Sequence, residues 1–416
     1  MSEIALGIDV GTSGIRVAAL TPAGERIAHA SAMMVEIGDD RRAPSVWEGA
    51  LKGALVRLSK NIDVKTVGAV AVDGTSGTVL GIGADGTPVG QALLYNDTVD
   101  EPAIVSRIDE VAPLDTAARG ASSALARAIA LMKRPGVVKI VHQADWIASL
   151  LAGGPVPSDE SNALKTGYDP IQRQWPQWIE DAGLPLNALP EVVPAGTVTS
   201  RTSGAFALRE GALVVAGVSD GCASFLATGA AQPGEGVTAL GTTLTIKLLS
   251  DRPVFAPQYG IYSHRIGDIW LAGGASNTGG GVLSTFFSDD QLTLLSAKID
   301  TSVDCGLDYY PLAKPGERFP ISDPAMAPRV SPRPSEDEQF LHGLLEGIAR
   351  IEALGYRRLQ ELGAPSLKAL YTVGGGAKNE TWSRLRGRIV GAPGRPAKSV
   401  DACEGVAKLG LPHLVQ

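Results

Sequence analysis

The sequence predicts an α/β protein built from two related halves. Apolar runs such as 67–72 and 213–216 carry no charge, which is typical of strands buried on both faces of a sheet. Segments with apolar residues at helical spacing lie between such runs, and this alternation indicates a sheet covered by helices. The third observation is a hairpin pattern at residues 4–20 that recurs at 237–248. We therefore expect a duplicated α/β domain.

The first hairpin surrounds a glycine-rich turn, GIDVGTSG, at residues 7–14. Its apolar flanks predict two strands, and its tip presents the hydroxyls of Thr12 and Ser13 beside the carboxylate of Asp9. Backbone N–H groups that no Cβ shields, such as that of Gly11, form a concavity suited to phosphate oxygens. Because a carboxylate would repel a phosphate, we predict a bridging Mg²⁺ near Asp9. The simpler alternative is a tight turn in which Asp9 only ends a strand.

The composition argues against several classes of function. The 416 residues are 44% hydrophobic and 19% charged, so the chain is long enough for two or three domains and shows no long disordered tract. A net charge of −7 argues against binding to nucleic acid or to an anionic membrane. Three widely spaced cysteines, Cys222, Cys305 and Cys403, fit neither a disulfide framework nor a metal motif. No secretory signal is recognisable, and we expect a cytoplasmic protein.

Further elements are predicted along the first half. A strand over 26–34 and a helix begun by a capping box at 45–48 lead to the buried strand 67–72. That strand ends in DGTSGT, residues 73–78, where ligands of such sheets bind, although a Ser/Thr-rich turn explains the same residues equally well.

Residues 90–210 are less regular, and we expect them to extend the first domain on the side of the substrate. Residues 93–97 are interpreted as the end of a strand, and a short helix is predicted from Gln143. The polar segment 158–163 is interpreted as a loop.

Asp220 is the next candidate for chemistry. It follows the apolar strand 213–216 and precedes an apolar helix, so it is placed either to meet a ligand or to cap that helix. The recurring hairpin at 237–248 then repeats the turn as Gly241-Thr242-Thr243, without an aspartate.

The C-terminal part contains a long helix and a glycine-rich turn. A second capping box at 335–338 and an apolar stripe predict a helix that stops at 363–365. After the strand 370–373, three consecutive glycines let a planar group or a sugar approach the backbone closely, with Asn379 as a polar anchor. A plain turn would need only one glycine, which favours a binding role.

The motifs GIDVGTSG, VSDG, LGTT, GGASN, GER and GGGAKN occur in an order and spacing that resemble the FGGY carbohydrate kinases over essentially the whole chain. VDGTSGTVL, LLYN, QADW, SNALKTGY and GLDYYPL are most similar to the D-ribulose kinases of cyanobacterial and plant-plastid type. The resemblance implies two ribonuclease-H-like domains of the actin-like ATPase and sugar kinase type, with a cleft between them. Residues 1–226 would bind the sugar, with 403–416 as a candidate return to this domain, and residues 227–402 would bind ATP.

The resemblance also implies roles for residues of the first domain. Asp220 would be the general base that accepts the proton of the sugar hydroxyl. Asp9 would hold Mg²⁺ through water and contact the sugar, as would Ser76. Thr12 would bind the transferring γ-phosphate.

In the second domain, Gly241 and Thr242 would meet the β-phosphate, and Gly375, Gly376 and Asn379 would line the adenosine pocket. The expected ligands are therefore ATP, Mg²⁺ and a small sugar.

Two departures from the family pattern narrow the expectation. Residues 95–100 lack the Trp and Arg of the Trp-x-Asp-x-Arg stretch that binds the polyol in many members, which argues against glycerol kinase and weakens xylulose kinase. The final helix, begun at 401–407, is cut short by Gly410 and Pro412. We therefore expect D-ribulose as the substrate, with D-xylulose or another small polyol as the alternative.

From a different class, a non-catalytic actin-like nucleotide-binding module or a sugar sensor remains an alternative. The presence of both Asp9 and Asp220 argues against it, because a sensor needs neither carboxylate.

Overall fold

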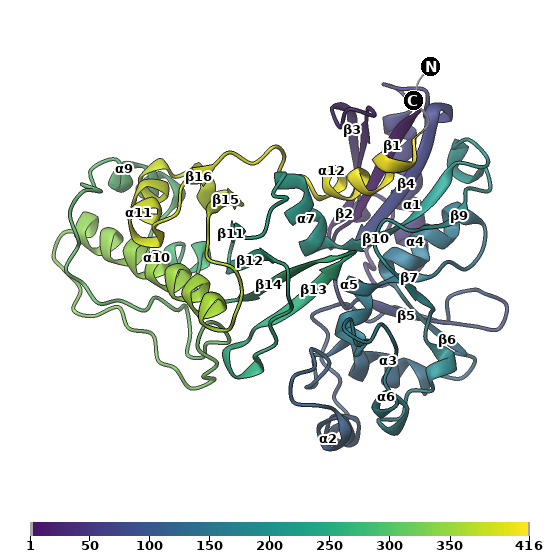
Figure 1. Cartoon of the computed structure of the whole chain (residues 1–416), viewed down its shortest axis with the longest axis horizontal. Helices are drawn as coiled ribbons and strands as arrows, with labels where there is room; N and C mark the ends of the chain where they lie inside the picture. Colours follow the sequence, from purple (N-terminus) through teal and green to yellow (C-terminus); the bar gives the residue numbers. More distant parts are fainter. Residues whose placement is uncertain (1–2, 415–416) are drawn as a thin grey trace. The chain divides into compact units, whose positions relative to one another are not determined.

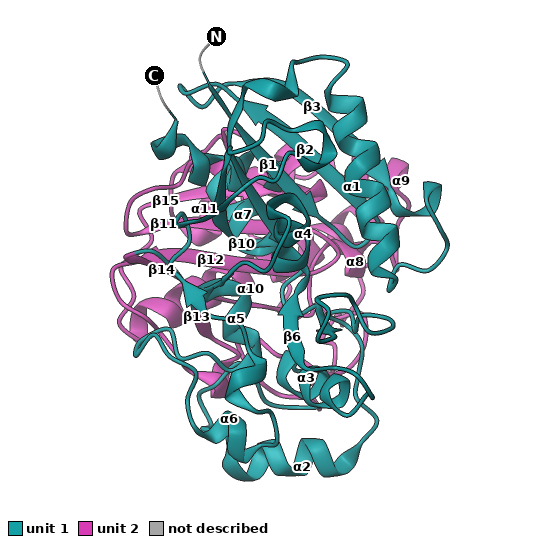
Figure 2. Ribbon diagram, turned by 90° about the vertical axis from the view of Figure 1, so that its right-hand side faces the viewer, with its two compact units in different colours: residues 1–227, 264–267, 401–416 teal, residues 228–263, 268–400 magenta. Residues whose placement is uncertain are grey.

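The computed structural model describes residues 3–414, and the chain forms two compact units. Unit 1 comprises residues 1–227, 264–267 and 401–416, and unit 2 comprises residues 228–263 and 268–400 (Figure 2). Within the described residues, no helix is both long enough and apolar enough to cross a membrane.

Unit 1 is built on a six-stranded mixed sheet (Figure 1). Its middle strands β1, β4 and β10 run parallel, as the wholly apolar run 67–72 predicts, and the outer strands are antiparallel to their neighbours. In spatial order the strands are β3 (Arg26–Met33), β2 (Gly14–Leu20), β1 (Ile4–Val10), β4 (Val67–Gly74), β10 (Leu213–Ser219) and β9 (Val198–Arg201).

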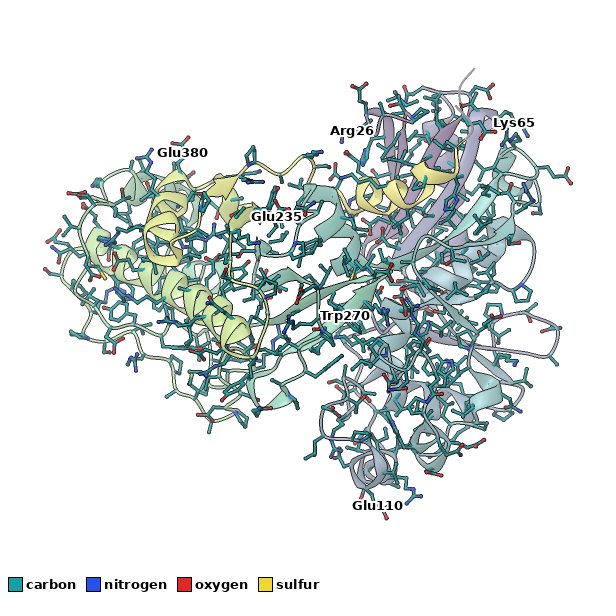
Figure 3. All side chains as sticks on the ribbon, in the orientation of Figure 1. Arg26, Lys65, Glu110, Glu235, Trp270 and Glu380 are labelled. Carbon is teal, nitrogen blue, oxygen red and sulfur yellow. The ribbon has the colours of Figure 1, made fainter. Side chains whose placement is uncertain are left out.

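Helices pack on this sheet. α1 (Pro44–Leu58) and α4 (Gln143–Ala152) share its main hydrophobic core. α12 (Ala402–Ala407) returns from the end of the chain and lies directly on β1, where a Cβ on Gly7 would meet the carbonyl oxygen of Cys403 at 1.8 Å. Arg26, labelled in Figure 3, fixes α12 through Asp401 and Glu404 at 3.1 and 2.7 Å. α7 (Asp220–Thr228) follows β10.

The segment between β4 and β10 adds a subsidiary lobe with its own hydrophobic core. Its elements are β5 (Val79–Ile82), α2 (Pro102–Val111), α3 (Ala124–Met132), β6 (Lys139–His142), β7 (Ser158–Asp159), α5 (Glu160–Ala163), α6 (Trp178–Asp181) and β8 (Val192–Val193).

Unit 2 repeats the topology of the unit 1 sheet. In each unit an antiparallel hairpin (β1–β2 or β11–β12) pairs through its first strand with a parallel strand (β4 or β15), which confirms the duplication predicted from the recurring motif. The strands of this second sheet in spatial order are β13 (Tyr262–Ile266, of which 264–266 are grouped with unit 1), β14 (Ile269–Ala275), β12 (Leu244–Ser250), β11 (Glu235–Leu240), β15 (Ala369–Val373) and β16 (Gly394–Arg395). The helices are α8 (Gly280–Leu283), α9 (Asp289–Ser296), α10 (Asp337–Glu361) and α11 (Glu380–Val390).

Both predicted capping boxes are wrong, although both helices form. α1 begins at Pro44, whose fixed φ suits the first helical position, and no side chain caps it. α10 begins after Glu336, again without a side-chain cap. The predicted strand end at 93–97 is also wrong, because that segment makes only an isolated bridge between Val79 and Leu93.

The prediction of a loop at 158–163 is wrong as well. The segment forms β7 and α5 and is wholly buried. Its polar groups satisfy one another, because the Asp159 carboxylate accepts hydrogen bonds from Ser161 and Asn162. Ser161 in turn accepts from the N–H of Ser219, at the end of β10. A polar sequence therefore supports the strand end that precedes Asp220.

Candidate functional site

Three carboxylates lie at the carboxyl ends of the parallel strands of unit 1. Asp9 on β1 is the register partner of Asp73 on β4, and Asp73 is the partner of Val218 on β10, two residues before Asp220. Side chains of register partners in a sheet point to the same face, so Asp9 and Asp73 are neighbours. The strand topology thus gathers these acids at the edge of the sheet where ligands of α/β proteins bind.

Asp73 is the most strongly perturbed of these acids. It is fully buried, and no described group donates a hydrogen bond to either of its carboxylate oxygens. Burial, followed by the negative charges of Asp9 and Asp220, raises the pKa of Asp73 well above its ordinary value. Burial therefore favours the protonated form of the Asp73 carboxyl.

Asp9 is buried but already has a cationic neighbour. Its Oδ2 lies 3.0 Å from Nη1 of Arg16, the residue opposite it on β2. Carboxylate oxygens such as those of Asp9 and Asp220 are ligands of the kind that Mg²⁺ prefers, so these two acids fit a hydrated Mg²⁺. They do not form a closed cage, because among the described residues only Asp304, Cys305 and Glu346 of unit 2 offer three possible metal ligands within 4.8 Å of one another.

The cluster in unit 2 has no need of a metal. The buried carboxylate of Glu346 is paired with the guanidinium groups of Arg350 and Arg388, which supply the compensating positive charge. We therefore interpret this cluster as an ion-pair network that supports α10.

Asp220 and Ser76 are brought together, as expected for two residues that contact one substrate. Oδ1 of Asp220 accepts a hydrogen bond from the N–H of Gly221 at 2.7 Å and lies 3.5 Å from the backbone N of Ser76. The Ser76 hydroxyl oxygen is buried and has no hydrogen-bond partner among the described residues. A polar ligand at the ends of β4 and β10 would supply that partner.

The glycine-rich turn after β1 forms, but the Gly11 N–H that was expected to face phosphate is already used within the turn. The N–H of Gly11 donates to the carbonyl oxygen of Gly14 at 3.0 Å, and the carbonyl oxygen of Ser13 accepts from Met34. Thr12 is exposed at the tip, and with Gly11 it lines a small cavity of about 10 Å³ inside unit 1.

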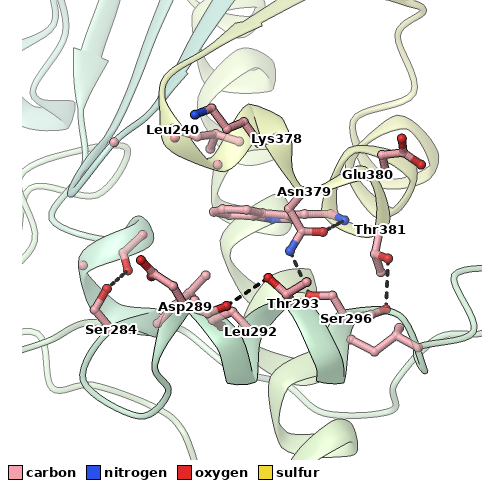
Figure 4. A pocket seen from close by; sticks show the side chains of 18 of the residues that line it. Leu240, Ser284, Asp289, Leu292, Thr293, Ser296, Lys378, Asn379, Glu380 and Thr381 are labelled. Carbon is pink, nitrogen blue, oxygen red and sulfur yellow. Dashed lines mark hydrogen bonds between the residues drawn. The ribbon is translucent and has the colours of Figure 1, made fainter.

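Unit 2 contains a cavity of about 950 Å³ that unites the predicted nucleotide loops (Figure 4). Gly241 and Thr242, from the β11–β12 turn, line it together with Gly375, Gly376 and Asn379, from the segment between β15 and α11. The cavity is large enough for a nucleotide. Residues far apart in the sequence thus meet at one site within this unit.

The structure explains two of the three consecutive glycines. Gly374 has a φ of +89°, which disfavours any side chain. A Cβ on Gly376 would lie 2.7 Å from the Trp382 ring and 2.8 Å from Cβ of Leu240. A Cβ on Gly375 would meet nothing within 4 Å, although Gly375 lines the cavity. Only Gly375 therefore lacks a structural reason, and a close-lying ligand would give it one.

Asn379 is more than the polar anchor that the sequence suggests. Its Oδ1 accepts from the N–H of Trp382 at 3.0 Å and so caps α11, and its Nδ2 donates to Ser296 Oγ at 2.8 Å (Figure 4). Thr381 donates to the Ser296 carbonyl oxygen at 2.9 Å. These contacts join the start of α11 to the end of α9, so the amide mainly holds the two walls of the cavity together.

Sequence reasoning missed two contributors. Asp73 was noticed only as one of several polar residues, because its significance depends on the register that places it beside Asp9. The contribution of α9 to the nucleotide-sized cavity, through Leu292, Thr293 and Ser296, had no signal in the sequence, since these residues follow an ordinary helical pattern.

Comparisons with known proteins agree with these features. The C-terminal domain of the FGGY family of carbohydrate kinases matches residues 236–411. A xylulose kinase from Streptomyces coelicolor is 24% identical over 97% of this chain and 86% of its own. A gluconokinase from Bacillus subtilis is 25% identical over 56% of this chain, and the match spans only about half of that relative, 51% of its length.

Solved structures show the same fold. A xylulose kinase from Bifidobacterium adolescentis superposes with a TM-score of 0.83 at 19% identity, and the match covers 99% of this chain and 92% of that one. The fold is thus that of the sugar kinases with two sheet-rich domains. Residues 236–411 are thus similar to the C-terminal domain of the FGGY carbohydrate kinases, and the similar relatives named above are kinases of sugars or sugar acids.

Proposed function

We propose that the protein is an ATP-dependent sugar kinase that transfers the γ-phosphate to the terminal hydroxyl of a pentulose. The observation that carries the proposal is the cavity of about 950 Å³ in unit 2, where the two predicted nucleotide loops meet. The second observation is the group of acids at the strand ends of unit 1, Asp9, Asp73 and Asp220, which is the proposed sugar site. Sugar binding by residues 1–226 and ATP binding by residues 227–402 are part of this proposal.

Asp220, Ser76 and Thr12 have different roles in phosphoryl transfer, a reaction that depends on alignment and charge more than on covalent chemistry. Asp220 accepts the proton of the sugar hydroxyl as the hydroxyl oxygen forms its bond to the γ-phosphorus. The bond from that phosphorus to the bridging oxygen of ADP breaks, and ADP leaves. The Ser76 hydroxyl, buried and unpaired in the described structure, binds the sugar beside Asp220. Thr12 contacts the γ-phosphate.

Asp9 and its surroundings set the local charge. Mg²⁺ bound through water to Asp9 would neutralise phosphate charge during the transfer. Arg16 holds one Asp9 oxygen at 3.0 Å and leaves the other for a ligand. A neutral Asp73 avoids a third negative charge beside the incoming phosphates, which is consistent with its burial.

D-ribulose is the proposed substrate because the motifs at 72–80, 93–96 and 161–168 most resemble those of D-ribulose kinases. D-xylulose is the second candidate, because relatives aligned over nearly the whole chain are xylulose kinases. How strongly a pocket separates such similar sugars depends on whether it hydrogen-bonds the hydroxyl in which they differ, so activity has to be measured across sugars.

The test is an ADP-release assay with the purified protein, ATP and Mg²⁺ across D-ribulose, D-xylulose, gluconate, glycerol and other polyols. D-ribulose should give the highest kcat/KM, and a preference for xylulose would overturn the substrate assignment. ATP binding without stimulation by any sugar would instead favour the nucleotide-binding module or sensor.

A further inference from the structure

A chain of buried hydrogen bonds in unit 1 ends on the side chain of Gln143, the first residue of α4. The Tyr95 N–H donates to Thr78 Oγ1 at 3.0 Å, and Thr78 Oγ1 lies 2.7 Å from Thr75 Oγ1. Oε1 of Gln143 accepts both from the Thr75 hydroxyl at 2.7 Å and from the Thr75 N–H at 3.1 Å.

These contacts fix which way the amide points. An Oε1 that receives two donors from Thr75 cannot be exchanged with Nε2, because an NH₂ group would then face the Thr75 N–H. With its own proton directed to Gln143, the Thr75 hydroxyl accepts from Thr78, which in turn accepts from Tyr95. Nε2 of Gln143 therefore points away from Thr75, with two N–H donors.

Those two donors have no acceptor among the described residues. Gln143 is only 2% exposed, so little of its amide is open to solvent. The residue lines the cavity of about 10 Å³ that Gly11, Thr12 and Tyr95 also line. This volume is close to that of one oxygen-sized group and is far too small for a phosphate.

We propose that Gln143 is a further substrate-binding residue, whose Nε2 donates a hydrogen bond to one hydroxyl or carbonyl oxygen of the acceptor sugar. This inference rests on the proposed function and extends it, because Gln143 would then contribute to sugar specificity. A neutral amide with two donors suits a neutral sugar oxygen. The Gly11–Thr12 turn on the same cavity places that oxygen next to the predicted phosphate loop.

The hydrogen-bond chain that orients Gln143 begins at a backbone group. The N–H of Tyr95 donates to Thr78 Oγ1 at 3.0 Å, so the position of residues 94–95 helps to hold the amide in place.

The sharpest variant is Gln143→Glu. It keeps the Oε1 acceptor for Thr75 and the shape of the side chain, but it replaces the NH₂ donor with an oxygen. We expect the KM for the preferred sugar to rise about tenfold or more, while the KM for ATP changes less than about twofold. Ser149→Ala, on the same helix, is the matched control and should change neither constant. An unchanged sugar KM in Gln143→Glu would overturn the proposal and leave a structural water as the occupant.

A second measurement separates contact from structural disturbance. Monodeoxy analogues of the sugar are compared in the wild type and in Gln143→Glu. For the analogue that lacks the oxygen bound by Gln143, kcat/KM relative to the parent sugar should fall about tenfold in the wild type. In Gln143→Glu the same comparison should give a fall of less than about twofold, because the variant has already lost the hydrogen bond to that oxygen. Equal relative losses for every analogue would overturn the assignment.

If the wild type phosphorylates no sugar at all, the proposed function fails. Calorimetric titration of D-ribulose into the wild type and into Gln143→Glu then still tests whether Gln143 binds the sugar. Weaker binding by the variant supports a contact, and equal binding, or no binding by either protein, overturns it.

Discussion

The two neighbouring glycines Gly375 and Gly376 should respond oppositely to the same substitution. In Gly375→Ala the new methyl meets no protein atom within 4 Å, and the residue does not have a positive φ. The folded protein should therefore keep its stability, or gain up to about 1 kcal/mol from the smaller entropy of the unfolded chain. The methyl would occupy space on the wall of the cavity, where the ligand is expected to lie.

Overpacking by one methyl costs about 1–3 kcal/mol, so ATP should bind Gly375→Ala about 5- to 150-fold more weakly. In Gly376→Ala the methyl would lie 2.7 Å from the Trp382 ring and 2.8 Å from Leu240 Cβ. In this variant the overpacking lowers the free energy of unfolding by about 1–3 kcal/mol, which lowers the Tm by several degrees.

Isothermal titration with ATP and thermal unfolding separate the two effects. Gly375→Ala should bind ATP more weakly at an unchanged or slightly higher Tm, and Gly376→Ala should have a lower Tm. Wild-type ATP affinity in a folded Gly375→Ala protein would refute the interpretation of this cavity as the nucleotide site. A Gly376→Ala protein as stable as the wild type would refute the packing argument.

Two further predictions concern buried charges. Because burial raises the pKa of Asp73, the folded protein holds a proton that the unfolded chain releases, and stability falls as pH rises between the two pKa values. Asp73→Asn removes this pH-dependent loss of stability. In metal-free buffer the Tm of the variant minus that of the wild type should therefore be larger near about pH 8 than near about pH 4. An equal difference in Tm at the two pH values would contradict a raised pKa of Asp73. Arg386→Met leaves the buried carboxylate of Glu352 without its partner at 2.6 Å and should cost about 3–5 kcal/mol in urea unfolding. The double variant with Glu352→Leu should recover much of that loss, and a double variant no better than Arg386→Met would argue against charge as the cause.

Much of the fold is predictable because its signals are local. The two hairpins, the buried strand β4 and the apolar stripe of α10 follow from periodicity within single segments, and all form as expected. The helix starts were harder, since α1 uses Pro44 in place of a side-chain cap.

The remaining features depend on contacts between distant residues. The segment 158–163 is buried because Asp159 satisfies its neighbours, which a count of polar residues cannot reveal. Asp73 becomes notable only through strand register, and Gln143 only through the hydrogen bonds that Thr75 makes to it. Asn379 lines the cavity of unit 2, and its cap on α11 and its hydrogen bond to Ser296 of α9 become visible only in the structure.

The central proposal is that Asp220 serves as the base in sugar phosphorylation. Asp220→Asn keeps an oxygen that can accept from Gly221, so the fold should be preserved. Sugar-dependent ADP release should fall by about 10²–10⁴-fold, while ATP affinity and Tm stay at the wild-type values. Full sugar-dependent activity in the folded Asp220→Asn protein would contradict this assignment.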